Sequence, residues 1–311
     1  PVPVPECACC LVHVALAPHG LDVARVRRVG FDQLAHARDL HVDRAVVGPG
    51  LAAVDALPPA APAATAPAAP WHRFPRGTGP GQLLHEQLEW LAGERFALAR
   101  EPALAAALRT RLGRRAPEVN ADDAVDWLAQ VCDTPVPALG AALSGLPRTW
   151  PELEFWLPTE GLDAARVDAL CREHVLPGHE RPALPPRRLR GLLMGFADLV
   201  FEAPDGRFGV LDHKSNALGD DDAAYTPEAL AAAVLHHRYD VQGALYLLAL
   251  HRLLGQRLGA RYEPARQLHG ATFLFLRGVA APGAGAWHLA PPMALIEGLD
   301  AMFSGAKGLP A

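Results

Sequence analysis

A short hairpin near residue 200 limits most strongly what this chain can fold into. Residues 195–201 (Gly-Phe-Ala-Asp-Leu-Val-Phe) and 207–213 (Arg-Phe-Gly-Val-Leu-Asp-His) are largely apolar runs of strand length. The five residues between them, 202–206, contain a Pro and an Asp-Gly pair, which favour a tight turn between antiparallel strands. The sequence therefore predicts that these two runs lie side by side in one sheet.

Three charged side chains of this hairpin are expected to meet. Asp198 lies in the middle of the first strand, where an apolar residue would be less costly, and it is expected to face Asp212 on the second strand. Asp212 and Lys214 are two residues apart, so in a strand they project to the same face. Only two of the 29 Lys and Arg residues are lysines. A lysine at this point suggests chemistry that needs a compact ammonium, which the planar guanidinium of arginine cannot supply.

Two carboxylates on neighbouring strands need a cation to neutralise them, because an unpaired buried charge is costly. With a lysine beside them they favour a divalent metal ion, most naturally Mg²⁺ with oxygen ligands and retained waters. An alternative stays open at this point. Asp198 could end a strand or cap a turn, and Asp212 could form a surface ion pair with Lys214.

The segments around the hairpin predict a mixed central sheet flanked by helices, which is the α/β class. Leucines at helical spacing and Ala/Leu-rich stretches up to about residue 145 predict an N-terminal helical subregion. Residues 153–157 predict a strand closed by Pro158, and residues 271–276 predict a buried strand. A helix is expected to start at Thr226-Pro227 and to run to about Leu258.

The first 65 residues differ in character from the rest. They form a poorly defined segment that ends in a Pro/Ala tract at residues 57–64, which is typical of a semi-rigid linker. Residues 66–311 are then expected to form one domain. Because the chain opens with Pro1 and not with Met, we expect it to be a piece of a longer protein.

Composition excludes several classes of protein. No apolar run of about 20 residues occurs, so we predict a soluble, cytoplasmic protein without a membrane span. No pair of Cys-x-x-Cys motifs occurs, so we expect free thiols and not a metal or disulfide framework. The five cysteines are Cys7, Cys9, Cys10, Cys132 and Cys171. The net charge of −5 gives little long-range attraction to nucleic acid, so any positive potential must be local.

Read in order, these blocks resemble a known family. Asp198 followed by Asp212-His213-Lys214 resembles the core of the PD-(D/E)xK nucleases. Longer strings narrow the resemblance to the carboxy-terminal nuclease domain of RecB, the beta subunit of exonuclease V. They are residues 195–201, 211–216 (Leu-Asp-His-Lys-Ser-Asn), 237–242 (His-Arg-Tyr-Asp-Val-Gln) with 245–246 (Leu-Tyr), and 273–279 (Phe-Leu-Phe-Leu-Arg-Gly-Val). The stretch from Phe74 to His85 resembles the beginning of that domain, so the similarity covers roughly residues 70 to 305.

The resemblance implies a restriction-endonuclease-like fold and a metal site. His85, Asp198 and Asp212 correspond to the metal-binding residues of the family. Lys214 corresponds to the lysine that orients or activates the attacking water. The implied ion is Mg²⁺, and Mn²⁺ or Ca²⁺ are also able to occupy such a site.

Other positions have weaker counterparts in the family. Tyr239 and Gln242 match its Tyr-x-x-Gln motif near the site, and at spacing i, i+3 they share one helix face. Glu152 matches an acidic position and is a candidate for a further ligand. The alternatives that Glu152 faces solvent, or that Glu154 takes this role, stay open. His213 stands where the family often has an aromatic residue, and we predict that its side chain points away from the acids.

The resemblance also implies an activity and partners. The activity is Mg²⁺-dependent hydrolysis of phosphodiester bonds in single-stranded DNA, by the exonuclease domain of a RecBCD-type helicase-nuclease in double-strand-break repair and recombination. The implied partners are DNA, RecC-like and RecD-like subunits and a helicase portion of the same protein. No Gly-x-x-x-x-Gly-Lys-Ser/Thr loop occurs, so no ATP site is expected in this chain.

Two rival functions remain at this point. One is a catalytically silent nuclease fold that binds DNA or a partner subunit, which an intact set of Asp198, Asp212 and Lys214 disfavours. The other is an iron–sulfur nuclease of the AddB kind. Such an enzyme needs cysteines after the long helix, and the last cysteine of this chain is Cys171.

Overall fold

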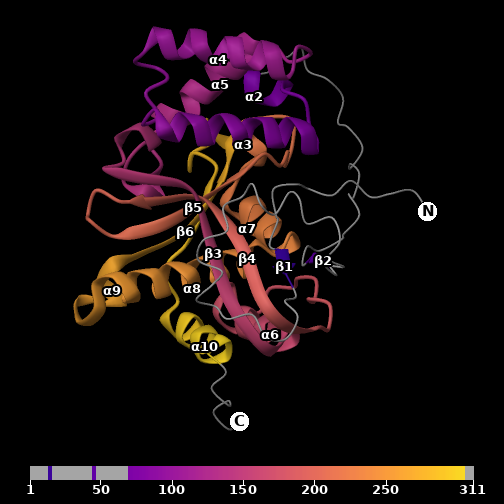
Figure 1. Cartoon of the computed structure of the whole chain (residues 1–311). Helices are drawn as coiled ribbons and strands as arrows, with labels where there is room; N and C mark the ends of the chain where they lie inside the picture. Colours follow the sequence, from indigo (N-terminus) through magenta and orange to yellow (C-terminus); the bar gives the residue numbers. More distant parts are fainter. Residues whose placement is uncertain (1–12, 16–43, 47–68, 305–311) are drawn as a thin grey trace, which may run out of the picture.

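The structure is a computed structural model that describes residues 13–15, 44–46 and 69–304 (Figure 1). The predicted N-terminal segment and linker, residues 1–65, lie outside the described residues apart from two three-residue strands. The predicted boundary of the domain at residue 66 therefore stays a prediction. The elements below keep the labels of Figure 1.

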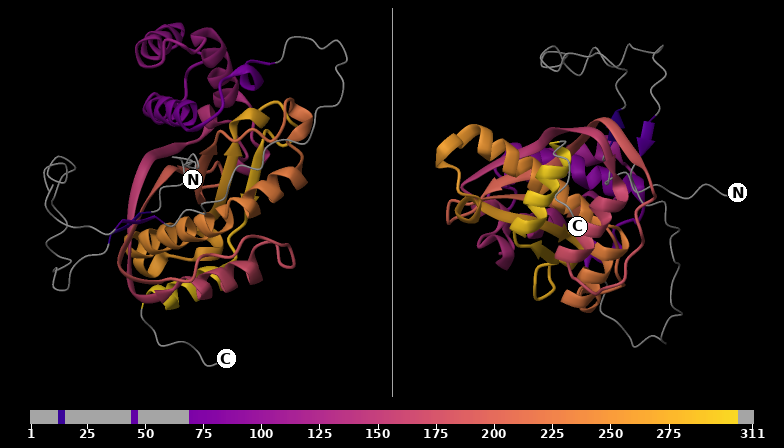
Figure 2. Two further views of the ribbon diagram at one scale, coloured as in Figure 1. Left: turned by 90° about the vertical axis from the view of Figure 1, so that its right-hand side faces the viewer. Right: turned by 90° about the horizontal axis from the view of Figure 1, so that it is seen from below.

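One mixed sheet forms the centre of the described chain (Figures 1 and 2). Its main body has the order β3-β4-β5-β6-β7, in which β5 and β6 are parallel and the other neighbours are antiparallel. The strands are β3 (Arg148–Asp163), β4 (Arg188–Glu202), β5 (Phe208–Lys214), β6 (Leu268–Phe275) and β7 (Ala286–Leu289). A short strand β1 (His13–Ala15) pairs with another stretch of β4. The strand β2 (Arg44–Val46) pairs with β1.

Helices cover both faces of this sheet. The N-terminal helices α2 (Pro70–Arg73), α3 (Thr78–Gly93), α4 (Pro102–Arg115) and α5 (Ala121–Asp133) gather at one end of the molecule (Figure 1). The helices α6 (Ala164–His174), α7 (Pro227–His236), α8 (Tyr239–Leu258) and α10 (Met293–Phe303) follow later in the chain. Single turns are η2 (Pro137–Leu139), η3 (Leu143–Gly145), η4 (Asp222–Ala224), η5 (Gly259–Arg261), α9 (Pro264–Gln267) and η6 (Leu276–Gly278).

The alternation of side chains along the hairpin separates two apolar cores. Leu199 and Leu211 are paired across β4 and β5 and join the core formed with α3, α4 and α5. Their neighbours Val200 and Val210 are also paired and join the core formed with α6, α8 and α10. Successive residues of a strand point to opposite faces, so both faces of the sheet are buried. The predicted mixed sheet flanked by helices is confirmed.

The predicted hairpin is also confirmed. β4 and β5 are antiparallel, and their register pairs Val200 with Val210 and Glu202 with Phe208. The N–H of Ala203 donates a hydrogen bond of 2.8 Å to the carbonyl of Arg207, and the N–H of Gly206 donates one of 2.9 Å to the carbonyl of Ala203. Gly206 has a φ of 83°, which few other residues adopt at low cost. The ladder ends at the pair Leu199 and Leu211, one residue before Asp198 and Asp212.

The prediction that Pro158 closes a strand is wrong. β3 continues through Pro158 to Asp163 and pairs with β4 over nearly its whole length. Among the described strands only β4 pairs with β3, so β3 lies at the edge of the sheet. A proline can occupy an edge strand because its missing N–H costs no ladder hydrogen bond on the open side.

The single helix predicted from Thr226 to about Leu258 is two helices. The predicted start is confirmed, because the Thr226 side chain accepts a hydrogen bond from the N–H of Ala229. The helix is interrupted at Arg238, whose φ of 57° is left-handed. The guanidinium of Arg238 is buried and lies 2.6 Å from Asp168 and 3.0 Å from Asp240. These ion pairs hold the chain in a conformation that sequence propensity does not predict.

A buried arginine ties the N-terminal helices to the sheet. Arg277 is 1% exposed and donates hydrogen bonds to backbone carbonyls on both sides of this junction. Its acceptors are the carbonyls of Trp71, Phe74 and Pro75, which precede α3, and the carbonyl of Ser215, which directly follows β5. The start of α3 is thereby held against the end of β5.

Candidate active site

The predicted site residues converge on one end of the β4–β5 hairpin. Asp198 comes from β4, Asp212 and Lys214 from β5, and His85 from α3. Gln242 and Tyr239 belong to α8, and Glu152 belongs to β3. Their contacts divide into an acid–imidazole cluster around Asp198 and a lysine–acid pair at Asp212.

The acid–imidazole cluster consists of His85, Asp198 and His213. Nδ1 of His85 lies 3.1 Å from Oδ2 of Asp198, and Nδ1 of His213 lies 3.4 Å from the same oxygen. The backbone N–H of His213 donates a hydrogen bond of 2.8 Å to this oxygen as well. One nitrogen of each ring and one oxygen of Asp198 all lie within 4.8 Å of one another. The cluster therefore offers three ligand atoms of the kind that hold a metal ion.

The prediction that the His213 side chain points away from the acids is wrong. Alternation does place His213 and Asp212 on opposite faces of β5. The ladder between the strands, however, ends before Asp198, so the N–H of His213 is available to the carboxylate of Asp198. This hydrogen bond brings Asp198 to the His213 side of the strand, where the imidazole meets it.

Charge in the cluster favours an ionised Asp198 and a protonated His85. Burial would raise the pKa of Asp198, but His85 and His213 outweigh it and hold that pKa well below its usual range. Burial would lower the pKa of His85, but the carboxylate of Asp198 outweighs it and the pKa is raised. The Nε2 atoms of both imidazoles are buried and have no hydrogen-bond partner among the described residues.

The lysine–acid pair is fully buried. Nζ of Lys214 lies 2.6 Å from Oδ1 of Asp212, and their side chains are 0% and 1% exposed. Nζ also donates a hydrogen bond of 2.9 Å to Oε1 of Gln242 and lies 3.8 Å from the ring centre of Tyr239. Burial raises the pKa of Asp212, although Lys214 opposes the shift. Gln242 and Tyr239 thus both contact the lysine, as their shared helix face predicts.

Tyr246 contacts the site, although sequence analysis assigned it no role beyond its place in the strings that resemble the family. Its hydroxyl lies 2.8 Å from Oδ2 of Asp212, and Nε2 of Gln242 lies 2.9 Å from the same oxygen. Burial and the neighbouring carboxylate of Asp212 raise the pKa of Tyr246 well above its ordinary value. Tyr246 follows Gln242 by four residues on α8, so the helical period after the Tyr-x-x-Gln motif could have found it.

Glu152 lies opposite Asp198. It falls between the pairs Pro151–Leu199 and Leu153–Ala197 in the register of β3 and β4, and its φ of 48° is left-handed. Glu152 is exposed as a residue, but partial burial of its carboxyl group and the charge of Asp198 raise its pKa to about 7. Glu154 instead pairs with Phe196. The geometry therefore favours Glu152 over Glu154 as the acid next to the cluster.

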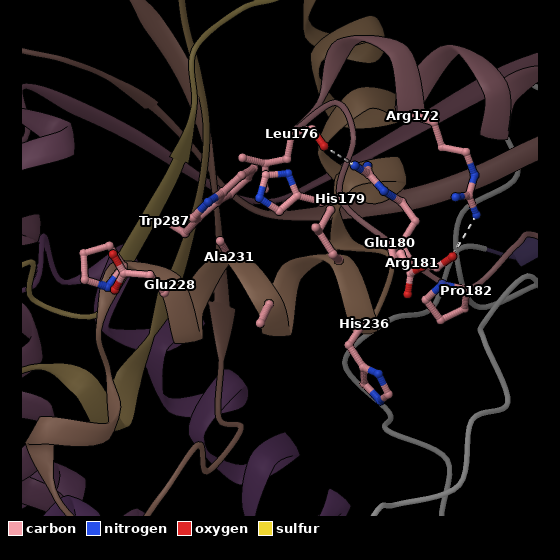
Figure 3. A pocket seen from close by; sticks show the side chains of 13 residues that line it. Arg172, Leu176, His179, Glu180, Arg181, Pro182, Glu228, Ala231, His236 and Trp287 are labelled. Atoms are coloured by element: carbon pink, nitrogen blue, oxygen red, sulfur yellow. Dashed lines mark hydrogen bonds between the residues drawn. The ribbon is translucent and has the colours of Figure 1, made fainter.

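A cavity of about 1000 Å³ lies elsewhere, between the loop that follows α6 and the outer side of α7 (Figure 3). Its walls include Arg172, His179, His236 and Trp287. None of the predicted site residues lines it. The candidate site is therefore defined by its side chains and not by this cavity.

The predicted free thiols and the predicted lack of a membrane span each concern residues that the structure describes in part. Cys132 and Cys171 are free and buried, and burial raises the pKa of both thiols. Within the described part of the chain, the helices are all too short or too polar to cross a membrane. Cys7, Cys9 and Cys10 lie outside the described residues.

The fold and the site together define a class. This is an α/β protein that gathers an acid–imidazole cluster and a buried lysine–acid pair at the end of one hairpin. Comparison with protein-family models gave no match. Comparison with curated proteins shows that the chain belongs to the family of RecB, the subunit of the RecBCD enzyme, so the predicted resemblance to RecB is confirmed.

Relatives from three bacteria illustrate the similarity. RecB of Escherichia coli K12 is 37% identical over 284 residues, which cover 89% of this chain and 23% of the relative. RecB of Mycobacterium tuberculosis CDC 1551 is 34% identical over 270 residues, which cover 74% of this chain and 24% of the relative. RecB of Haemophilus influenzae is 32% identical over 237 residues, 74% of this chain and 19% of the relative. The chain thus spans about a quarter or less of the length of these relatives.

Proposed function

We propose that this chain is a divalent-metal-dependent deoxyribonuclease domain that hydrolyses phosphodiester bonds of single-stranded DNA, as an exonuclease V type enzyme. The observation that carries the proposal is the buried pair of Asp212 and Lys214 beside the cluster at Asp198. Full burial of two charges is costly, and replacement by apolar residues is often neutral or stabilising. Such a pair at the end of a hairpin is more simply explained by chemistry than by stability.

The residues fit a divalent ion. His85 and Asp198 would hold it, because a ring nitrogen of His85 lies 3.1 Å from Asp198. Asp212 would be a ligand because the family resemblance implies it, and Glu152 would be a further ligand because it lies opposite Asp198. A bound Mg²⁺ would polarise the scissile phosphate and acidify a water molecule. Burial and then the charge of Asp198 raise the pKa of Glu152, and a bound cation would offset that negative charge.

The protein's own side chains would orient the attacking water and hold the catalytic lysine in place. Lys214 would orient the attacking water and offset negative charge that develops on the phosphate. Gln242 holds the lysine by a hydrogen bond of 2.9 Å and also contacts Asp212, so it would fix the direction of both groups. Tyr239 would keep the ammonium in place through its ring face, since cations are attracted to aromatic rings at this distance.

The test is cleavage of a fluorescent single-stranded oligonucleotide by the purified chain with Mg²⁺, Mn²⁺ or EDTA. Asp198→Asn should lower the rate by about three orders of magnitude, as expected when metal-ion or oxyanion-type stabilisation is lost. Glu154→Gln, on the same edge strand as Glu152, is the matched control and should cleave normally. His85→Ala should weaken Mg²⁺ or Mn²⁺ binding in calorimetry. Near-normal cleavage by Asp198→Asn would refute the assignment.

The alternative, a catalytically silent nuclease fold that only binds DNA or a partner, predicts a different result. A module that only binds would retain the oligonucleotide in a gel-shift experiment and would leave it uncut in every divalent ion. The wild-type chain should instead yield shorter products within minutes in Mg²⁺, and EDTA should stop the reaction.

We further propose that a helicase portion and RecC-like and RecD-like subunits deliver the strand. With a net charge of −5 the chain alone should bind DNA weakly and with a modest dependence on salt. Digestion by the chain alone should therefore be much less processive than digestion by the same domain joined to these partners. Equal processivity, or tight binding by the chain alone at about 0.2 M salt, would exclude the delivery model.

A further inference from the structure

His213 is the one member of the acid–imidazole cluster that no expected role explains. Its side chain is 4% exposed and its Nδ1 lies 3.4 Å from Oδ2 of Asp198. The ring of His85 approaches the same oxygen from α3, and the two ring centres are 6.0 Å apart at an angle of 84°. Two imidazoles from different elements therefore converge on one carboxylate oxygen.

The distances in the cluster are those found between ligands of a small divalent ion. Bonds of about 2.0 to 2.2 Å from metal to nitrogen or oxygen place neighbouring ligand atoms about 2.8 to 3.6 Å apart, in octahedral or tetrahedral geometry. The separations of 3.1 Å and 3.4 Å from Asp198 to the two rings fall in this range. Two of the three separations therefore already suit one ion, and all three ligand atoms lie within 4.8 Å of one another.

The unpartnered nitrogens are a second observation. Nε2 of His85 and Nε2 of His213 are both buried without a hydrogen-bond partner among the described residues. A buried polar atom without a partner is costly, because it has lost its hydrogen bonds to water. Each ring thus keeps a nitrogen uncommitted, either to bind an ion directly or to take up the proton when the other nitrogen binds.

We propose that His213 is a metal ligand, so that this chain adds a second imidazole to the His85 and Asp198 ligands of the proposed ion. Imidazole nitrogen suits Co²⁺ and Zn²⁺, and Mn²⁺ accepts it more readily than Mg²⁺, which prefers oxygen ligands and bound water. The site therefore favours these later ions over Mg²⁺ more strongly than a site with one imidazole. This inference rests on the proposed metal site and specifies which ions it selects.

The test counts imidazole ligands directly. Pulsed electron paramagnetic resonance of the wild-type chain loaded with Mn²⁺ should show nitrogen couplings from two imidazoles. His213→Phe, which keeps an aromatic ring but no nitrogen, should show one. Calorimetry should show that this variant loses about tenfold or more in the ratio of Mn²⁺ to Mg²⁺ affinity. His269→Phe removes a buried imidazole outside the cluster and should leave both readouts unchanged.

The outcomes separate this inference from the proposed function. Coupling to a single imidazole in the wild-type chain, or an unchanged affinity ratio in a folded His213→Phe variant, overturns the inference even if the chain cleaves DNA. Coupling to two imidazoles in a chain that cleaves DNA with no divalent ion overturns the proposed function and keeps the inference. The measurement on the wild-type chain decides even if His213→Phe fails to fold.

Discussion

Separate removal of Lys214 and Asp212 should destabilise the fold far more than removal of both. The two side chains are 0% and 1% exposed and 2.6 Å apart, so neither charge has access to water. Removing one partner of a buried ion pair leaves an uncompensated charge and costs about 3 to 5 kcal/mol. Lys214→Met and Asp212→Leu should each lose this amount. The double variant should lie within about 2 kcal/mol of wild type, because both desolvation costs disappear together.

Urea denaturation of the four proteins measures this coupling as a double-mutant cycle. The cycle should give a coupling free energy of at least about 3 kcal/mol between the two residues. Cleavage should respond differently, because all three variants should lose about three orders of magnitude in rate, or about 4 kcal/mol of transition-state stabilisation. Lys214→Arg should fail too, since the guanidinium is larger than the buried space around the ammonium and cannot become neutral.

Two results would refute this reasoning. A cost below about 1 kcal/mol for Lys214→Met would show that Asp212 does not depend on the ammonium for its charge. A double variant that is stable and cleaves DNA normally would show that the pair takes no part in the chemistry. A stable but inactive double variant is the result that assigns the pair to function.

Three further predictions concern stability and use the same denaturation assay. Arg277→Met should cost about 3 kcal/mol or more, because four backbone carbonyls lose their donor, and a cost below about 1 kcal/mol would contradict this. Burial lowers the pKa of His288 from 6.5 to about 4, so the folded state resists protonation and stability falls as the pH drops between these values. From pH 7.5 to pH 5 this group should account for a loss of about 2 kcal/mol, which His288→Gln should abolish. Gly270→Ala should cost about 2 kcal/mol or more, because φ is 138° and a Cβ would lie 2.4 Å from the carbonyl oxygen of Leu289. Gly113→Ala in α4, where a Cβ meets nothing, should instead stabilise the chain by up to about 1 kcal/mol.

Local patterns predicted the part of the site that is local in sequence. The turn residues between β4 and β5 determine an antiparallel pair, and the period of a strand then places Asp212 and Lys214 on one face. The i, i+3 spacing of Tyr239 and Gln242 likewise placed both beside the lysine. These relations depend only on chain geometry over a few residues.

Tertiary contacts determined what the patterns missed. Arg238 carries no sequence signal for a helix break, and its left-handed conformation depends on Asp168 and Asp240. Glu152 has a positive φ that few residues other than glycine, asparagine and aspartate adopt readily. His85 is 113 residues before Asp198, so only the packing of α3 on the sheet brings them together. Family resemblance, and not residue spacing, pointed to His85.

The two acids of the hairpin lie in opposite electrostatic environments although they are neighbours across the strands. Asp198 meets two imidazoles, which hold its pKa low, whereas burial raises the pKa of Asp212 against the opposing effect of Lys214. Sites that separate the properties of two similar groups in this way are typical of acid–base or metal chemistry. Burial and the charge of Asp198 raise the pKa of Glu152 to about 7, so this third acid is partly protonated near neutral pH. A divalent cation bound between Asp198 and Glu152 would offset that charge, so binding should release protons near pH 7, which calorimetry in buffers of different ionisation enthalpy can measure.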